Sequence, residues 1–578
     1  DGVPLNPDGA GTVDLSELPL WAFSRVEVYR GNAPAQLASA PMGGVVDLRT
    51  GDGEVSTKVG LAGAGGSYRT GRLGAVVAAP FTLRHTPGDV LAFADGFSTA
   101  GSFAYFDNNG TAYNMLDDSI RERSNNQKAQ LNAHGRVRLG VSNRRLSLIQ
   151  SFLERHEGLP GHSASATTAA SLSTRRSLSV VQADGTRGVA KGTARAWSLL
   201  RRELLEDPKG EIGTGSGTSE QHFATVGLLL HGQRALGPNV VPGLTTAVRT
   251  DRHVAGADDN DPARRISVTA SASGDGHLWD GRITLSAVAQ ALSLHDAVGD
   301  AGDHLLAFTP RGGVLVNPVP WLALKANAGR YLRPPDFTEL FGDRGAVIGN
   351  PDLEPERGVQ WDVGARLISP EHWTTQVSLD GGHFWNASTG LIVMVQNAQR
   401  TMVPLNLDDA WVQGWEGALS VVHPWVDSQT SLTRTTSVNL SDKEQYANNQ
   451  LPRVPALEVQ QLTALVWQDR VRLGHSLSHT AGNYWDRTNF YEAPPRTLHG
   501  LFLRASPGPR WPELNIDVHN IFDRTTQVVD RNPLDPSDTS RMVQPITDFV
   551  GYPLAGRTLM VTLRWQHIPV PAAEVSPR

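Results

Sequence analysis

The sequence predicts an all-β membrane barrel, and three observations support that prediction. Several long stretches alternate between apolar and polar side chains, which is the period of a β-strand. These stretches exceed the length of about 5–6 residues that is usual for strands of soluble proteins. Between them, tight turns alternate with long polar connections, as in transmembrane barrels. A large soluble sandwich or propeller is the alternative, although no blade repeat of about 40–50 residues is found.

One stretch, KAQLNAHGRVRL from Lys128 to Leu139, alternates without a break. Its odd-numbered positions carry Ala, Leu, Gly and Val, and its even-numbered positions carry Lys, Gln, Asn, His and Arg. Such a strand spans roughly 40 Å, and a tilt near 45° reduces its height to about 28 Å. That height matches a hydrocarbon core of about 30 Å. We therefore expect one face to meet lipid and the other to meet a wet interior.

Later segments repeat the pattern, and the connections between strands are uneven. Apolar side chains alternate with polar ones along residues 283–289, 514–518 and 559–565. Residues 140–146, GVSNRRL, are typical of a tight turn, whereas residues 155–192, rich in Ser, Thr and Gly, are expected to form a long polar connection. Residues 251–265 and 528–557 are expected to form further long connections.

Composition narrows the classes of function. The absence of cysteine excludes disulfides and thiolate chemistry. A net charge of -6, from 52 basic and 58 acidic residues, gives no reason to expect a nucleic-acid partner. No H-E-x-x-H, phosphate-binding glycine loop or nucleophile elbow is found. We expect binding and gating rather than enzymatic catalysis.

The N-terminal fifty residues resemble the end of the plug domain of TonB-dependent outer-membrane receptors, with most similarity to the vitamin B12 and siderophore receptors. The resemblance rests on residues 14–16 (DLS), 25–31 (RVEVYRG) and 43–50 (GGVVDLRT). Asn32 stands where the family has proline. Later motifs follow in family order: residues 103–127, 157–161 (EGLPG), 330–356 (the strongest match), 414–416 (GWE) and 515–565.

This resemblance implies about 22 antiparallel strands that enclose the C-terminal part of a small α/β plug domain. Residues 1–50 correspond to that plug piece and residues 51–565 to the transmembrane barrel, which ends on the aromatic Trp565. Residues 566–578 follow as a C-terminal tail that is expected to be disordered. The upstream plug, with any TonB-binding segment, is expected to be missing from this chain.

Candidate site residues also come from the resemblance. Arg25 and Arg30 of the plug are expected to pair with the barrel carboxylates Glu356 and Glu416, because charged contacts hold a plug without a covalent bond. The alternative is that all four lie in separate solvated ladders. A second site is the plug apex, where substrate contact is expected from Asn6, Asp8 and Ala10; a structural turn is the alternative.

No cofactor or resident metal is expected. Asp258, Asp259 and Asp261 supply oxygens of the kind that calcium prefers, but they lack the spacing of a complete loop site, so a solvated cluster is favoured.

The resemblance implies a receptor in the outer membrane of a Gram-negative bacterium, monomeric and surrounded by lipid. It would import a scarce small-molecule nutrient, such as siderophore-bound iron or cobalamin, without covalent chemistry. TonB and the inner-membrane energising complex would be its partners. The alternative is a signalling receptor of the same fold without net transport. A passive porin is disfavoured because porins carry no plug with this signature.

Overall fold

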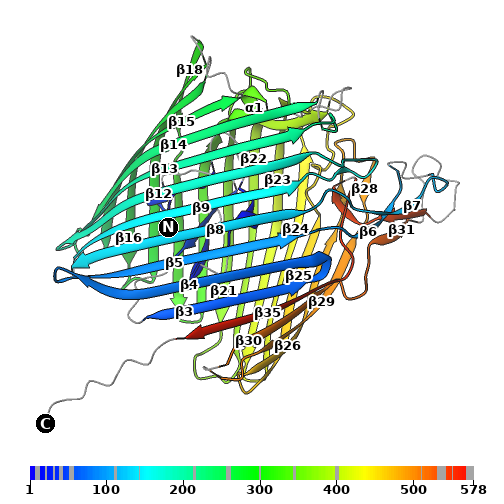
Figure 1. The fold of residues 1–578 in the computed structure, drawn as a ribbon. Helices are drawn as coiled ribbons and strands as arrows, with labels where there is room; N and C mark the ends of the chain where they lie inside the picture. Colours follow the sequence, from blue (N-terminus) through cyan, green and yellow to red (C-terminus); the bar gives the residue numbers. More distant parts are fainter. Residues whose placement is uncertain are drawn as a thin grey trace.

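The computed structural model describes most of the chain (Figure 1). The described residues are 1–6, 13–19, 23–29, 33–37, 43–50, 57–109, 114–141, 143–212, 216–255, 262–298, 301–342, 347–396, 402–508, 511–529, 542–549 and 551–567. Within them, no helix is long and apolar enough to span a membrane.

The dominant element is one closed β-sheet whose neighbouring strands are all antiparallel. Its strands are β3 (Lys58–Gly66), β4 (Thr70–Leu83), β5 (Thr86–Thr99), β8 (Lys128–Val141), β9 (Arg144–Gly158), β12 (Ser171–Arg187), β13 (Ala190–Asp207), β14 (Gly217–Arg234), β15 (Val240–Ala255), β16 (Ala263–Leu278), β17 (Ile283–Val298), β18 (Ala301–Phe308), β19 (Arg311–Val319), β20 (Leu322–Arg333), β21 (Glu356–Ile368), β22 (Gln376–Gln396), β23 (Met402–His423), β24 (Val426–Asn439), β25 (Leu457–Trp467), β26 (Val471–Ala481), β29 (Arg496–Ala505), β30 (Glu513–His519) and β35 (Thr558–His567).

The barrel closes where the first wall strand meets the last, since β3 pairs with β35 and Leu61 lies opposite Trp565. β18 and β19 pair with the two halves of β17 in one register, so they form a single strand interrupted at Thr309 and Pro310. Proline has no backbone N–H to donate to a ladder, which accounts for the break. The described residues therefore form a closed barrel of 22 antiparallel strands, as predicted.

The alternation predicted for residues 128–139 is present in β8. Gln130, Asn132 and Arg136 are buried toward the interior, whereas Leu131 is 48% exposed on the outer face. Leu559 and Leu563 on β35 are likewise exposed. Exposed apolar side chains along the outer face of the strands are typical of transmembrane barrels.

The sequence-based expectation for residues 155–192 was wrong. Residues 171–187 form β12, which pairs with β9 and β13 along its whole length. Its outward positions include Ser173, Ser177 and Ser179, and its buried inward positions include Leu178 and Val180. Because the outer face of β12 is polar, the residues together resemble a polar loop. The connection expected at 251–265 is also shorter, since β15 reaches Ala255 and β16 begins at Ala263.

The two ends of the barrel differ. One end, which we call the short-turn rim, carries the hairpin connections at residues 84–85, 142–143, 188–189, 235–239, 279–282, 320–321, 369–375, 424–425, 468–470 and 506–512. Most of the long connections lie at the other end. They contain β6 (Ala104–Asp107), β7 (Ser119–Glu122), β10 (Gly161–His162), β11 (Ser165–Ala166), α1 (Phe337–Phe341), β27 (Asn483–Tyr484), β28 (Glu492–Ala493), β31 (Thr526–Val529), β32 (Met542–Pro545), β33 (Thr547–Phe549) and β34 (Tyr552–Pro553). Figure 1 shows β6, β7, β28 and β31 gathered at the end of the barrel opposite the hairpin that joins β4 and β5.

The N-terminal residues lie inside the barrel, as their contacts with inward-facing wall residues establish below. They form a short hairpin of β1 (Arg25–Tyr29) and β2 (Val45–Arg49), and the 3-10 turns η1 (Leu15–Glu17) and η3 (Ala35–Leu37). We call residues 1–50 the plug segment.

Candidate functional site

The most heavily charged contact between the plug segment and the wall is built around Glu17. Its carboxylate is fully buried, and three inward-facing arginines converge on it. Arg176 Nη1 on β12 donates to Oε2 at 2.6 Å, and Arg201 Nη2 on β13 donates to Oε1 at 3.0 Å. Nη2 of Arg155 on β9 lies 3.8 Å from Oε1 of Glu17. We call Glu17 with these three arginines the Glu17 cluster.

Local sequence explains how Glu17 is aimed at the wall. Asp14 caps η1, since its side chain accepts from the backbone N–H of Ser16 at 2.8 Å. The single turn that follows places Glu17 toward β12 and β13. Gln130 on β8 donates to the carbonyl oxygens of Ser16 and Glu17 at 3.2 and 3.3 Å, which holds the turn itself.

A second carboxylate strengthens the same contact. Arg155 Nη1 donates to Asp14 Oδ2 at 2.6 Å. Partial burial of Asp14 opposes its ionisation, but hydrogen bonds from Arg155 and Ser16 outweigh burial and lower the pKa of Asp14 to about 2. Asp14 therefore stays ionised at any ordinary pH, and its bond to the wall persists.

Further arginines of the wall donate hydrogen bonds to the backbone of the plug segment. Carbonyl oxygens of the plug accept from the arginines at 2.6 to 3.4 Å, and because backbone is the acceptor, these contacts do not depend on plug side chains. The pairs are Arg136 with Thr50, Arg195 with Gly2, Arg249 with Asn6 and Arg311 with Ala33.

An apolar contact lies beside these polar ones. Val3 and Leu5 of the plug segment pack against a cluster of inward-facing wall residues on β12, β13, β14 and β15. The cluster consists of Leu178, Val180, Trp197, Leu199, Leu229 and Ala247. Inward-facing apolar side chains are unusual in an aqueous lumen, and their burial against the plug removes them from water.

The predicted lock residues lie as follows. Arg25 pairs with Glu27 of its own strand at 2.8 Å, and Arg30 lies outside the described residues. Glu356 accepts two hydrogen bonds from Arg333, at 2.9 Å each, in a wall network. Glu416 lies on β23 opposite Thr433. The pairing of these plug arginines with the wall carboxylates stays a prediction.

The plug apex is only partly described. Asn6 is exposed and its carbonyl oxygen accepts from Arg249 at 3.2 Å, whereas Asp8 and Ala10 lie outside the described residues. The possible calcium ligands Asp258, Asp259 and Asp261 also lie outside them. Among the residues that the structure does describe, no group of three or more His, Asp or Glu is placed to hold a metal ion.

Sequence reasoning missed Glu17, although signals for it were present. Glu17 directly follows the DLS motif. Arg155, Arg176 and Arg201 lie on neighbouring wall strands, and such buried cations require an anion nearby. Only the register of β9, β12 and β13 brings the three together, and a polar segment that resembles a loop gives no sign of that register.

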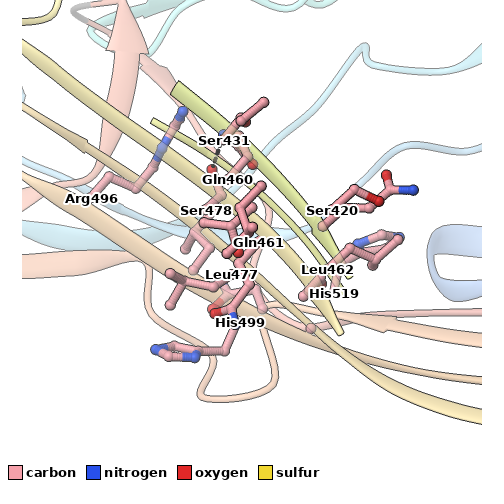
Figure 2. Close-up of a pocket in the computed structure, with 18 of the residues that line it drawn as sticks. Ser420, Ser431, Gln460, Gln461, Leu462, Leu477, Ser478, Arg496, His499 and His519 are labelled. Atoms are coloured by element: carbon pink, nitrogen blue, oxygen red, sulfur yellow. Dashed lines mark hydrogen bonds between the residues drawn. The ribbon is translucent and has the colours of Figure 1, made fainter. Parts of the chain in front are cut away.

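A separate pocket of about 750 Å³ lies on the wall between β22 and β35. Ser431, Gln460 and Ser478 are register partners that line it, and Gln460 donates to Ser478 at 2.9 Å (Figure 2). Gln460 lies on the opposite face of β25 from the exposed Trp467, so the pocket opens into the lumen. Eleven of its 24 lining residues carry a neutral hydroxyl or amide group that can hydrogen-bond to a polar solute, and the others include five leucines.

Two family models match the chain. One described as TonB dependent receptor-like, beta-barrel, matches residues 49–521, and one described as the TonB-dependent receptor plug domain matches residues 1–45. No curated protein matches the chain.

Several solved structures share the fold. The FrpB iron transporter from Neisseria meningitidis (F5-1 variant, apoprotein) is 13% identical with a TM-score of 0.74, covering 95% of this chain and 88% of that one. The siderophore receptor PirA from Acinetobacter baumannii is 14% identical with a TM-score of 0.72, covering 96% and 87%. The copper transporter OprC is 14% identical with a TM-score of 0.74, covering 96% and 87%.

Proposed function

The chain belongs to the TonB-dependent receptor family, and from that membership we propose that it imports a scarce nutrient across the outer membrane of a Gram-negative bacterium. The cargo we propose is a small molecule of the siderophore-iron or cobalamin kind. TonB, energised from the inner membrane, is the proposed partner that displaces the plug. Receptors and transporters, not enzymes, make up the family and its structural neighbours.

The Glu17 cluster is the observation that carries this proposal. It holds the plug segment against the wall of the closed barrel by ion pairs and hydrogen bonds. These contacts are strong, but they are not covalent. Charge-assisted hydrogen bonds of this kind contribute about 1.5–3 kcal/mol each. A pulling partner can break such bonds one after another, and they re-form when the plug returns.

The cargo class rests on two kinds of support. Structural neighbours are named for iron, siderophores, copper and ferric citrate. The lumen pocket has hydroxyl and amide groups, with Arg496 and His519 among its lining residues, and these groups can hydrogen-bond to the polar groups of a chelate.

Uptake of labelled compounds tests the proposal. Gram-negative cells that express the receptor are given radioactive ferric citrate, a ferric hydroxamate siderophore or labelled cyanocobalamin, with matched cells that lack TonB as the control. We expect accumulation of one of the compounds only when TonB is present. Equal accumulation without TonB would refute energised import, and specific binding without any accumulation would favour a signalling receptor.

A further inference from the structure

The short-turn rim is divided into two arcs of different chemistry. Four consecutive hairpins, from β4–β5 to β14–β15, each carry an exposed arginine: Arg84, Arg144, Arg187 and Arg234. The next six hairpins, from β16–β17 to β29–β30, each carry an exposed tryptophan: Trp279, Trp321, Trp373, Trp425, Trp467 and Trp511. We call these sets the arginine arc and the tryptophan arc. Tryptophan at this position is the usual anchor at a membrane interface, so the arginine arc is the feature that needs an explanation.

The segments next to the four arginines contain no acidic residue. Residues 82–87, 140–147, 185–192 and 232–241, which surround the four arginines, contain no Asp or Glu. The nearest carboxylates have other partners. Asp89 accepts hydrogen bonds from Arg136 and Arg138. Asp184 accepts hydrogen bonds from Gln182 and Thr193. Within the described residues the four arginines form no ion pair. In contrast, an acidic residue lies within two residues of five of the six tryptophans: Asp280, Glu371, Asp427, Asp469 and Glu513.

The arginines also adjoin the lipid-facing surface. Each lies within two residues of an exposed apolar side chain: Leu83 (53% exposed), Leu146 (41%), Val189 (59%) and Leu236 (57%). Arg144 and Leu146 occupy alternate positions of β9 and therefore share its outer face. Adjacent hairpins of a barrel are two strands apart, so neighbouring arginines lie about 10 Å from one another along the rim.

We propose that the arginine arc binds the phosphate groups of anionic glycerophospholipids in the leaflet that the short-turn rim contacts. A guanidinium forms paired hydrogen bonds to a phosphate, and the neighbouring leucine or valine contacts the acyl chains of the same lipid. An acidic polypeptide would bind the end of the barrel, whereas these arginines flank its apolar side wall. The side wall therefore favours lipid. The proposal goes beyond import, since it concerns the membrane around the barrel and not the cargo.

A matched pair of double variants tests the proposal. Arg144→Gln with Arg187→Gln removes half of the arginine arc, and Arg282→Gln with Arg470→Gln removes two exposed arginines from the connections of the tryptophan arc. The purified chain and both variants are exchanged into mixed phosphatidylglycerol and phosphatidylcholine, and the lipids that stay bound are counted by native mass spectrometry. Heat-modifiable migration on gels confirms that each variant is a folded barrel.

We expect the chain to retain phosphatidylglycerol in preference to phosphatidylcholine. A cation near an anionic lipid surface contributes about 1 kcal/mol, or roughly a fivefold preference, so the first variant should lose up to about 25-fold. The second variant should keep the preference. No preference in the unmodified chain, or equal losses in both variants, would overturn the proposal. Displacement of the bound lipid by a soluble poly-glutamate peptide would also overturn it, in favour of an acidic polypeptide partner.

Discussion

Replacing Glu17 by alanine should release the plug segment from the wall. Glu17 is fully buried, and its carboxylate is the only ion-pair partner of Arg176 among the described residues. Arg201 keeps Glu203, and Arg155 keeps Asp14 and Glu157. The variant therefore leaves one buried guanidinium, that of Arg176, without a counter-charge among the described residues.

The loss of this one ion pair sets the size of the expected effect on plug release. Removal of one partner from a buried ion pair costs about 3–5 kcal/mol, because the other charge stays desolvated. The population of released plug should rise by roughly two to four orders of magnitude. Glu17→Gln keeps an acceptor oxygen but no charge, so it should release the plug less readily than Glu17→Ala does.

Conductance in planar bilayers measures this release. As urea is raised, plug release appears as large channel openings, and Glu17→Ala should open at a lower urea concentration than the unmodified receptor. Glu27→Ala is the matched control, because Glu27 pairs with Arg25 and Arg49 inside the plug segment itself. Glu27→Ala should open at the same urea concentration as the unmodified receptor. If Glu17→Ala also opens at that concentration, the Glu17 cluster does not hold the plug.

Three further predictions concern other parts of the plug and its wall. The pKa of Asp14 falls from 3.8 to about 2 on folding, so its stabilising contact should be complete above pH 3.8 and lost as the pH falls toward 2; Asp14→Asn should remove that dependence from the conductance assay. Burial and the nearby Glu339 raise the pKa of Asp336 to about 6, so stability should increase as the pH falls through 6, and Asp336→Asn, which keeps the helix cap, should abolish that change in thermal unfolding. Trp197→Ala should lower the free energy of unfolding by about 3–5 kcal/mol, measured as a lower denaturant midpoint; an unchanged midpoint would contradict the packing of Val3 and Leu5 against it.

Strand periodicity was predictable wherever the outer face is apolar. In β8 the sequence places Leu131 and Val137 on one side and Gln130 and Arg136 on the other, and the structure keeps that division. The same holds for β35. Period-two alternation is a local property of the chain, because successive side chains of a strand point to opposite faces whatever surrounds them.

β12 shows where this local argument fails. Its outer serines make the segment polar, and its apolar positions face inward against Val3 and Leu5. Side chains still alternate along β12, but where the plug covers the wall the apolar ones face inward and the polar ones face outward. A rule that assigns apolar residues to lipid cannot detect a strand whose apolar face is covered by protein.

For the charged contacts between the plug segment and the wall, the sequence predicts that they exist but not which residues form them. The sequence argument expected arginines on the plug and carboxylates on the wall, and those pairs stay untested because Arg30 lies outside the described residues. The described contacts instead place Glu17 and Asp14 on the plug and arginines on the wall. Residue types alone require that buried charges be paired, but they do not say with which partner.

The order of residues by itself determined that this chain forms long amphipathic strands, that they enclose a plug and that chemistry with cysteine is absent. Tertiary structure decided which strands are neighbours, and hence that Arg155, Arg176 and Arg201 converge on one buried carboxylate. Alternation is set by the backbone within a few residues, whereas the meeting of charges from strands far apart in the chain depends on the register of the closed sheet.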